Sequence, residues 1–220
     1  MRLAIILSLG LTALPAYAQN TPSGDETASP AAEPEGEAWR LMSDGRQLRA
    51  DDTARLEQLN IGVGDSLLAA LAGADDADRA VLVDGLSGTA LPPDQARPLL
   101  QGEWGCRTVK VGLGTLPIVV YPEFRCRIDA QGHFEKLTGS QRSSGDIADW
   151  QGQLIYAGTG FVQGETPIAY AEQCEDVDTS RTPQMMPQVG RVEITSPETG
   201  RILFPRPYLE SQLDLLILRR

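Results

Sequence analysis

The stretch "LLQGEWGCRTVKVG", residues 99–112, marks the point where the sequence changes from a helical to a strand-like pattern. Before it, apolar residues recur every three or four positions, whereas after Gly102 polar and apolar residues alternate. A period of two is typical of a strand with one buried face. Trp104, Cys106 and Thr108 share one face of this strand. The stretch therefore predicts the first strand of a β-structure that begins in the middle of the chain.

Residues 99–220 are predicted to form seven or eight short strands. Turn sequences such as "DAQG" at 129–132 and "SPETG" at 196–200 separate them. No strand–helix–strand alternation is visible, so we expect antiparallel strands that close into a barrel, or stack as a sandwich. The expected strands are 103–111, 118–128, 133–139, 153–161, 167–172, 189–195, 201–204 and 212–219.

The first 38 residues carry the marks of an exported protein. Residues 1–18, "MRLAIILSLGLTALPAYA", have one basic residue, an apolar run too short to span a bilayer and small residues at the cleavage positions. They predict a signal peptide cleaved after Ala18, and hence a periplasmic or secreted protein. Residues 19–38 are acidic and rich in Pro and Ala, which predicts a disordered leader.

Residues 39–98 are predicted to form a helical segment that packs on the barrel. Asp51 and Asp52 suit a helix start, and Gly62 and Gly64 favour a kink or break. A second short helix is expected from Asp75. The apolar residues at helical spacing are Leu56, Leu59, Val63, Leu67 and Leu71.

The composition argues against two classes of partner. The chain has 30 acidic and 19 basic residues, a net charge of −11. An acidic protein without a basic stripe is repelled by nucleic acid and by anionic lipid surfaces. No stretch after the signal peptide is apolar enough to span a membrane. We therefore expect no nucleic acid and no membrane span, and a small ligand or an envelope protein as partner.

The three cysteines predict one disulfide and one free thiol. If the first two strands form a hairpin with Cys106 opposite Cys126, both sulfurs lie on the apolar face. Trp104 then falls opposite Ile128. An oxidising compartment favours the bond, and two buried thiols are the alternative. Cys174 lies in an acidic stretch and is the expected free thiol.

The opening stretch resembles the lipocalin or wider calycin pattern. A helical turn, then Gly102-x-Trp104 on a first strand, and then a barrel that ends in "LDLLILRR" carry the likeness. The resemblance implies a calycin-like barrel whose first-strand Trp is covered by a basic side chain of the last strand. This basic side chain would come from Arg219 or Arg220, and Arg219 is the last residue of the expected strand. A second motif between the middle strands and a helix after the barrel are both absent from the sequence.

A second resemblance covers residues 39–219. The blocks "GCRTVKVG", "YPEFRCRI", "EKLTGSQRSSG", "LIYAGTG" and "YLESQLDLLIL" are similar to an uncharacterised exported bacterial family, domain of unknown function 4893. This family implies one continuous folded unit. It implies no activity, substrate or catalytic residue.

The strongest candidate for a binding site is the polar stretch "KLTGSQRSSGD", residues 136–146. Hydroxyl and amide groups beside one arginine suit a carboxylate, a phosphate or a sugar. The alternative is an ordinary polar strand exit. The candidate ligand-binding residues are Thr138, Ser140, Gln141 and Arg142.

Other chemical motifs are weak. "GDSL" at 64–67 matches a serine hydrolase block, but Ser66 lies on a helical face and lacks the required late Asp-x-x-His. The single histidine, His133, begins a strand after a turn, where an exposed histidine is ordinary. No spacing predicts a metal site or a cofactor. Glu210 and Asp214 are a weak acid–base pair.

These observations favour a non-enzymatic binding module in the cell envelope. A near alternative is a barrel that binds a protein, since exported barrels with a Gly-x-Trp strand and one disulfide also resemble metalloprotease inhibitors. A hydrolase using carboxylates and the Ser/Arg stretch is a further alternative. An interior cavity of about 300 Å³ or more would favour a small ligand. A filled interior would favour a protein partner or a structural role.

Overall fold

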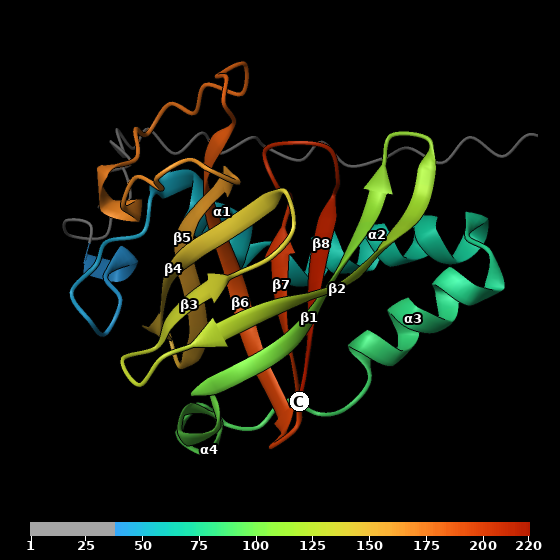
Figure 1. Ribbon diagram of the computed structural model, residues 1–220, viewed down its shortest axis with the longest axis horizontal. Helices are drawn as coiled ribbons and strands as arrows, with labels where there is room; N and C mark the ends of the chain where they lie inside the picture. The colour runs from blue at the N-terminus through green and yellow to red at the C-terminus, as the bar shows by residue number, and fades with distance from the viewer. Residues whose placement is uncertain (1–37) are drawn as a thin grey trace, which may run out of the picture. The chain divides into compact units, whose positions relative to one another are not determined.

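The computed structural model describes residues 38–220, which form a closed barrel of eight antiparallel strands with helices on its outside (Figure 1). The predicted signal peptide and nearly all of the predicted leader lie outside the described residues. Each strand pairs with the next in the chain, and β1 pairs with β8 to close the sheet. The predicted class, mostly β with an N-terminal helical segment and an antiparallel barrel, is confirmed.

The helices precede the barrel in the chain. The strands are β1 (Gly102–Leu113), β2 (Leu116–Ile128), β3 (His133–Lys136), β4 (Gln141–Trp150), β5 (Gln153–Val162), β6 (Met185–Ser196), β7 (Thr199–Pro205) and β8 (Leu213–Arg219). The α-helices are α1 (Ala50–Glu57), α2 (Leu59–Gly73), α3 (Asp76–Leu86) and α4 (Pro93–Ala96). Short 3-10 turns lie at Ala38–Arg40, Arg97–Leu99 and Tyr170–Glu172.

Two strand assignments from the sequence were wrong. Residues 167–172 contain no strand and end in a 3-10 turn. The polar stretch 136–146, of which only residues 136–139 belong to an expected strand, contains most of β4, which pairs with both β3 and β5. The first half of its sequence, "QRSSGD", lacks the apolar alternation that marks a strand, because its inward positions there are Gln141, Ser143 and Gly145.

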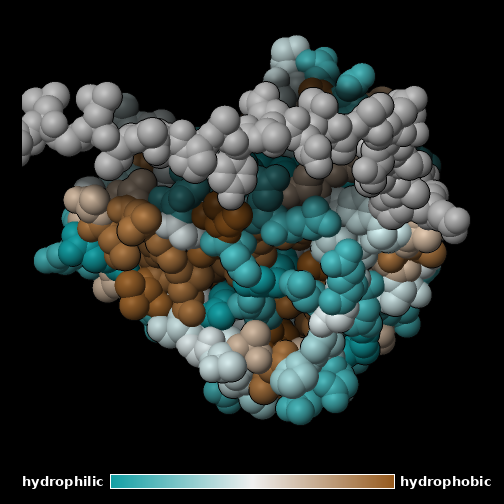
Figure 2. Space-filling view, turned by 180° about the vertical axis from the view of Figure 1, so that it is seen from behind, coloured by the Kyte–Doolittle hydropathy of each residue, from teal (hydrophilic) through white to brown (hydrophobic). Residues whose placement is uncertain are grey.

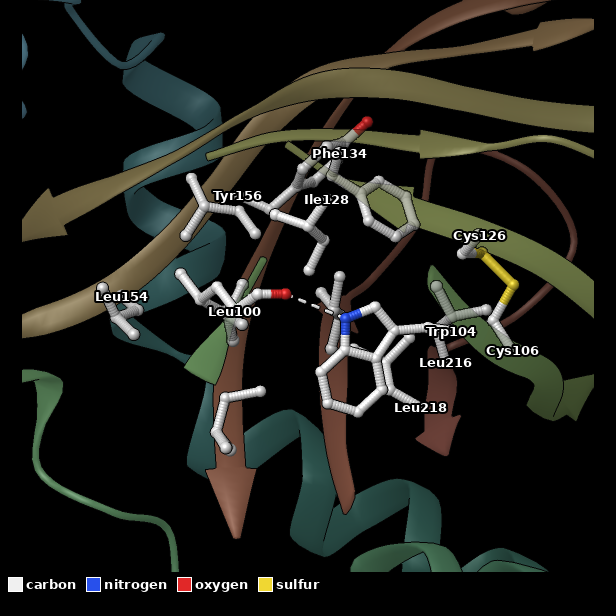
Figure 3. Packing of buried hydrophobic residues seen from close by; sticks show 14 of the residues in the cluster. Leu100, Trp104, Cys106, Cys126, Ile128, Phe134, Leu154, Tyr156, Leu216 and Leu218 are labelled. Atoms are coloured by element: carbon white, nitrogen blue, oxygen red, sulfur yellow. Dashed lines mark hydrogen bonds between the residues drawn. A yellow bond between two sulfur atoms is a disulfide. The ribbon is translucent and has the colours of Figure 1, made fainter. Parts of the chain in front are cut away.

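Side chains from all parts of the sheet fill one end of the barrel (Figure 3). Trp104 is 2% exposed, and its Nε1 donates a hydrogen bond of 2.9 Å to the carbonyl of Leu100. The α4 segment lies across this end (Figure 1). Apolar burial of this extent is the main source of stability for such a domain. The cluster includes Trp104, Ile128, Phe134, Ile147, Leu154, Tyr156, Ile194, Ile202, Leu216 and Leu218.

The helices cover the outside of the sheet where β1, β2, β7 and β8 meet. Outward residues of these strands, such as Val109 and Leu215, pack against α2 and α3. The break between helices falls at Gln58, not at Gly62 or Gly64, which both lie within α2. Apolar side chains also remain on the surface over α2 and α3 (Figure 2), and the largest are Ile61, Leu68, Leu71 and Val83.

The disulfide joins Cys106 and Cys126, as predicted, but the register differs. Trp104 pairs with Cys126, and Cys106 pairs with Phe124, so the bond links diagonal neighbours with Cα atoms 5.9 Å apart. A shift of two residues keeps every side chain on its predicted face, because strands alternate with period two. Cys174 is exposed and free.

The basic residue over Trp104 is Arg220, not Arg219. The guanidinium carbon of Arg220 lies 3.8 Å from the centroid of the Trp104 ring. Alternation along β8 turns Leu218 and Arg220 toward the barrel end and Arg219 outward. Arg219 accordingly forms an ion pair with Asp84 of α3, at 2.5 Å. Across residues 38–220, no helix is long and apolar enough to cross a membrane.

Candidate functional site

A cavity of about 120 Å³ opens at the barrel end opposite Trp104. Thr108 and Lys110 follow Trp104 and Cys106 on the inner face of β1 and form part of its wall. The loop 206–212 between β7 and β8 forms one rim, and Glu210 in it has a left-handed φ of 76°. We call this region the barrel mouth. Its other lining residues are Arg55, Lys136, Gln141, Arg142, Ser143, Gly160, Phe161, Val162, Gln184, Met186, Pro187, Gln188, Val189, Phe204, Pro207, Tyr208, Leu209, Asp214 and Leu216.

The cavity is small because aromatic rings fill the barrel below it. Tyr156 is fully buried and packs edge-on against Phe134 and Phe204, with ring centroids 5.4 and 5.8 Å apart. Inward glycines make room for these rings: a Cβ at Gly158 would lie 2.3 Å from the Tyr156 hydroxyl. The volume is below the 300 Å³ or so of a typical small-molecule pocket. The space therefore suits a small head group rather than a whole lipophilic ligand.

The mouth holds both lysines of the chain. Lys110 and Lys136 are the only lysines among the 220 residues, and both line this cavity. Each sits at an inward position of its strand, in line with Trp104 on β1 and Phe134 on β3. A protein with a net charge of −11 thus places both of its lysine side chains at one barrel end.

Lys110 is neutralised within the mouth. Its Nζ forms an ion pair with Glu210, and Asp214 lies nearby. Burial opposes the charged form, but Asp214 and Glu210 raise the pKa of Lys110 above its usual range. Burial in turn raises the pKa of the Asp214 carboxyl, against the opposing effect of Lys110. This amine is therefore already satisfied.

Lys136 has no such partner. Its Nζ lies 4.3 Å from the centroid of the Phe124 ring, and it pairs with no carboxylate of residues 38–220. Burial, followed by the nearby charges of Lys110 and Arg142, lowers the pKa of Lys136 to about 8. A partly buried cation next to other cations is stabilised by an anion brought to it. Lys136 is the group in the mouth that most lacks a counter-charge.

The sequence-predicted binding residues divide into two pairs. Gln141 and Arg142 line the mouth, and the Arg142 Nε is buried without a hydrogen-bond partner in the described part of the chain. Thr138 and Ser140 do not line it. The Thr138 hydroxyl accepts a hydrogen bond of 2.8 Å from the backbone N–H of Arg125, and Ser140 is exposed in the turn before β4.

The remaining sequence candidates have structural roles. Ser66 is fully buried in α2, where its hydroxyl donates to the carbonyl of Gly62 at 2.7 Å. Glu210 and Asp214 both line the mouth, but Glu210 pairs with Lys110, and Asp214 accepts from the Ser211 hydroxyl. Within residues 38–220, no group of three or more His, Cys, Asp or Glu is placed to hold a metal ion.

Sequence reasoning missed both lysines, although a signal was present. Lys110 continues the series Trp104, Cys106 and Thr108, whose common face the sequence identifies. Lys136 follows Phe134 in the same way on β3. A charged residue in register with buried apolar ones is a candidate functional group, because an unpaired buried charge is costly to fold.

Comparison with known proteins identifies the family. The family model described as Domain of unknown function (DUF4893) matches residues 45–218, and the chain belongs to this family. No curated protein and no solved structure matches the chain. The family description assigns no activity, ligand or partner.

Proposed function

We propose that this DUF4893 protein is an exported binding protein that holds a small amphipathic anion by its charged head in the barrel mouth. The observation that carries the proposal is Lys136, a partly buried amine that pairs with no carboxylate of residues 38–220, in a mouth whose other lysine is already paired. Arg142, with its buried and unpartnered Nε, adds a second donor beside it.

The shape of the mouth favours a carboxylate with a short apolar tail. A cavity of about 120 Å³ accommodates a head group, and the rim beside it carries Phe161, Met186 and Leu209. A carboxylate matches the donors of a lysine and an arginine, and apolar rim residues cover the first carbons of a tail. The rest of a longer ligand would lie outside the barrel.

Export is part of the proposal. The N-terminal sequence has the composition of a cleaved signal peptide, and the disulfide between Cys106 and Cys126 suits an oxidising compartment. N-terminal sequencing of the protein recovered from the periplasm should begin at Gln19. Recovery of chains that still begin at Met1 would argue against export.

The binding proposal is tested by calorimetric titration of the folded protein with hexanoate and with hexan-1-ol. Hexanoate should bind and the uncharged alcohol should not. Lys136→Met keeps the length of the side chain but removes the charge, and should weaken hexanoate binding by roughly 10- to 100-fold, the loss of one charge-assisted hydrogen bond. The matched control is Arg181→Met, which removes an exposed cation from the loop before β6. This variant should bind hexanoate as the wild type does.

Two results would contradict the proposal: equal binding of hexanoate and hexan-1-ol, or unchanged binding in Lys136→Met. A second candidate function, a barrel that binds a protein, is favoured by the filled interior beneath the mouth. In that case the anion is a carboxylate of the partner, and free hexanoate shows no measurable heat.

A further inference from the structure

Three polar side chains from neighbouring strands meet on the outer surface of the barrel. The Nδ1 of His133 on β3 lies 2.5 Å from Oδ1 of Asp146 on β4, and its Nε2 lies 3.2 Å from Oγ of Ser144. The pairing of β3 with β4 sets His133 opposite Asp146. Ser144 is two residues before Asp146, so both point to the same side of the sheet.

The order of these contacts fixes the direction of the hydrogen bonds. An ionised carboxylate only accepts, so Asp146 requires the proton of the imidazole to be on Nδ1. Nε2 is then an acceptor and takes the hydroxyl hydrogen of Ser144. A hydroxyl bonded to the free nitrogen of an imidazole, with a carboxylate behind the ring, is the arrangement of serine nucleophiles on several unrelated folds.

Other contacts hold the carboxylate and the ring in place. Oδ2 of Asp146 forms an ion pair of 3.2 Å with Arg46, whose guanidinium also pairs with Asp44. Partial burial raises the pKa of Asp44, but the hydrogen bonds from Arg46 outweigh this effect and lower the pKa below its usual range. The backbone N–H of His133 donates to the side chain of Asp129 at 2.8 Å. Asp146 and His133 are therefore each held in place by a residue outside the group of three.

An open hollow of about 220 Å³ is lined by Ser144, and Lys136 and Arg142 of the barrel mouth border it as well. Leu137 and Phe161 give it apolar walls, and Arg142 lies two residues before Ser144 on the same outer side of β4. Arg142 also lines this hollow, so its guanidinium is a candidate donor to a carbonyl oxygen placed over Ser144. Positive donors at this position stabilise the negative oxygen of a tetrahedral intermediate.

We propose that Ser144 is the nucleophile of an esterase site for small carboxylic esters, with His133 as its base and Asp146 as a positioning residue. Its reacting groups differ from the head-group site proposed for Lys136, although Lys136 and Arg142 line both hollows. Ser144 Oγ forms a bond to the carbonyl carbon while its proton passes to Nε2 of His133. The ester C–O bond then breaks, and the leaving oxygen takes the proton from Nε2 and departs as the alcohol.

Water completes the cycle. It attacks the acyl group on Ser144 as His133 takes its proton. The bond between Ser144 Oγ and the carbonyl carbon then breaks, and Oγ regains the proton as the acid leaves. The sum is one ester and one water to one acid and one alcohol, with no other reactant.

The test labels the folded, full-length protein with a fluorophosphonate, which forms an Oγ–P bond and releases fluoride. Mass spectrometry of the digest should find the adduct on Ser144. His133→Gln should lower the labelling rate at least tenfold. Ser180→Ala is the matched control, because the Ser180 hydroxyl contacts a carboxylate, Asp178, without a histidine, and it should label as the wild type does.

A second measurement separates catalysis from folding. The wild type should hydrolyse p-nitrophenyl acetate, Ser144→Ala should lose this activity, and Asp146→Asn should lower kcat while KM stays the same. Circular dichroism of each variant checks its fold. Absence of the adduct from Ser144 in the folded wild type would overturn the proposal, as would ester hydrolysis that persists in Ser144→Ala. Neither result bears on hexanoate binding through Lys136.

Discussion

Arg220 covers Trp104: its guanidinium carbon lies 3.8 Å from the centroid of the indole ring. The same guanidinium donates hydrogen bonds to the carbonyls of Leu99, Leu100 and Gln101, at 2.9, 3.2 and 2.6 Å. The indole in turn donates to Leu100. These contacts tie the last residue of the chain to the segment before β1, and so close the barrel end opposite the mouth.

Removing the side chain of Trp104 should destabilise the fold strongly, and removing that of Arg220 should destabilise it less. Trp104→Ala should lower the free energy of unfolding by about 3–5 kcal/mol, as for other large buried aromatics. Arg220→Ala should lower it by about 1–2 kcal/mol, since a cation–π contact and bonds to carbonyls are lost. Arg219→Ala, at the neighbouring outward position, is the control. Urea unfolding followed by circular dichroism measures all three, and an equal effect of the two arginines would contradict the assignment.

The disulfide should stabilise the barrel, and Cys174 should not. Cys106 and Cys126 are 20 residues apart. Closing a loop of this size contributes about 3 kcal/mol in the loop-entropy account. Replacing both cysteines by serine should cost about this much in urea unfolding, and Cys174→Ser should cost nothing measurable. Thiol titration of the unfolded, non-reduced protein should give one thiol per chain, and three would show that the bond is absent.

The buried hydroxyl of Tyr156 should destabilise the fold. It has no hydrogen-bond partner within the described residues, and burial raises its pKa far above the usual range. An unpaired buried polar group costs about 1–3 kcal/mol. Tyr156→Phe keeps both edge-on ring contacts and removes this hydroxyl, so it should raise the free energy of unfolding by about 1 kcal/mol. A loss of stability in urea unfolding would show that the hydroxyl is paired.

Lys136 should make stability depend on pH in a defined direction. Folding lowers its pKa from 10.5 to about 8, so the unfolded chain binds more protons between these two pH values. The contribution of this group to the free energy of unfolding therefore rises as pH increases from 8 to 10.5. Lys136→Met should be more stable than the wild type at pH 7, and the difference should shrink above pH 8. A constant difference across this range would contradict the pKa shift.

The fold followed from the sequence more completely than the site did. Alternation about Trp104 and Cys106 predicts the faces of β1 correctly, because a strand buries one side whatever its exact register. The register itself depends on which residues pair, and it differed by two positions. The choice of Arg219 over Arg220 was wrong although the predicted strand and β8 both end at Arg219, because the alternation that turns Leu218 inward continues past the strand end to Arg220.

The groups of both candidate sites come together only through the pairing of strands. Lys110 and Lys136 are on β1 and β3, and their approach requires that both strands pair with β2. His133 and Ser144 were separated in the sequence interpretation because β4 was taken as a loop. The first half of β4 lacks the signal that would reveal such a pair, since its outward residues Arg142, Ser144 and Asp146 are polar and its inward residues Gln141, Ser143 and Gly145 are polar or glycine.

The most direct measurement is the titration of the two lysines by NMR after reductive methylation with ¹³C-formaldehyde. Because the chain has only Lys110 and Lys136, each gives one side-chain signal, and Lys136→Met assigns them. Lys136 should titrate near pH 8 and Lys110 above its usual range. Saturating hexanoate should raise the Lys136 midpoint and leave that of Lys110 nearly unchanged. Ordinary lysine titration at both sites, with no response to hexanoate, would contradict an anion-binding mouth.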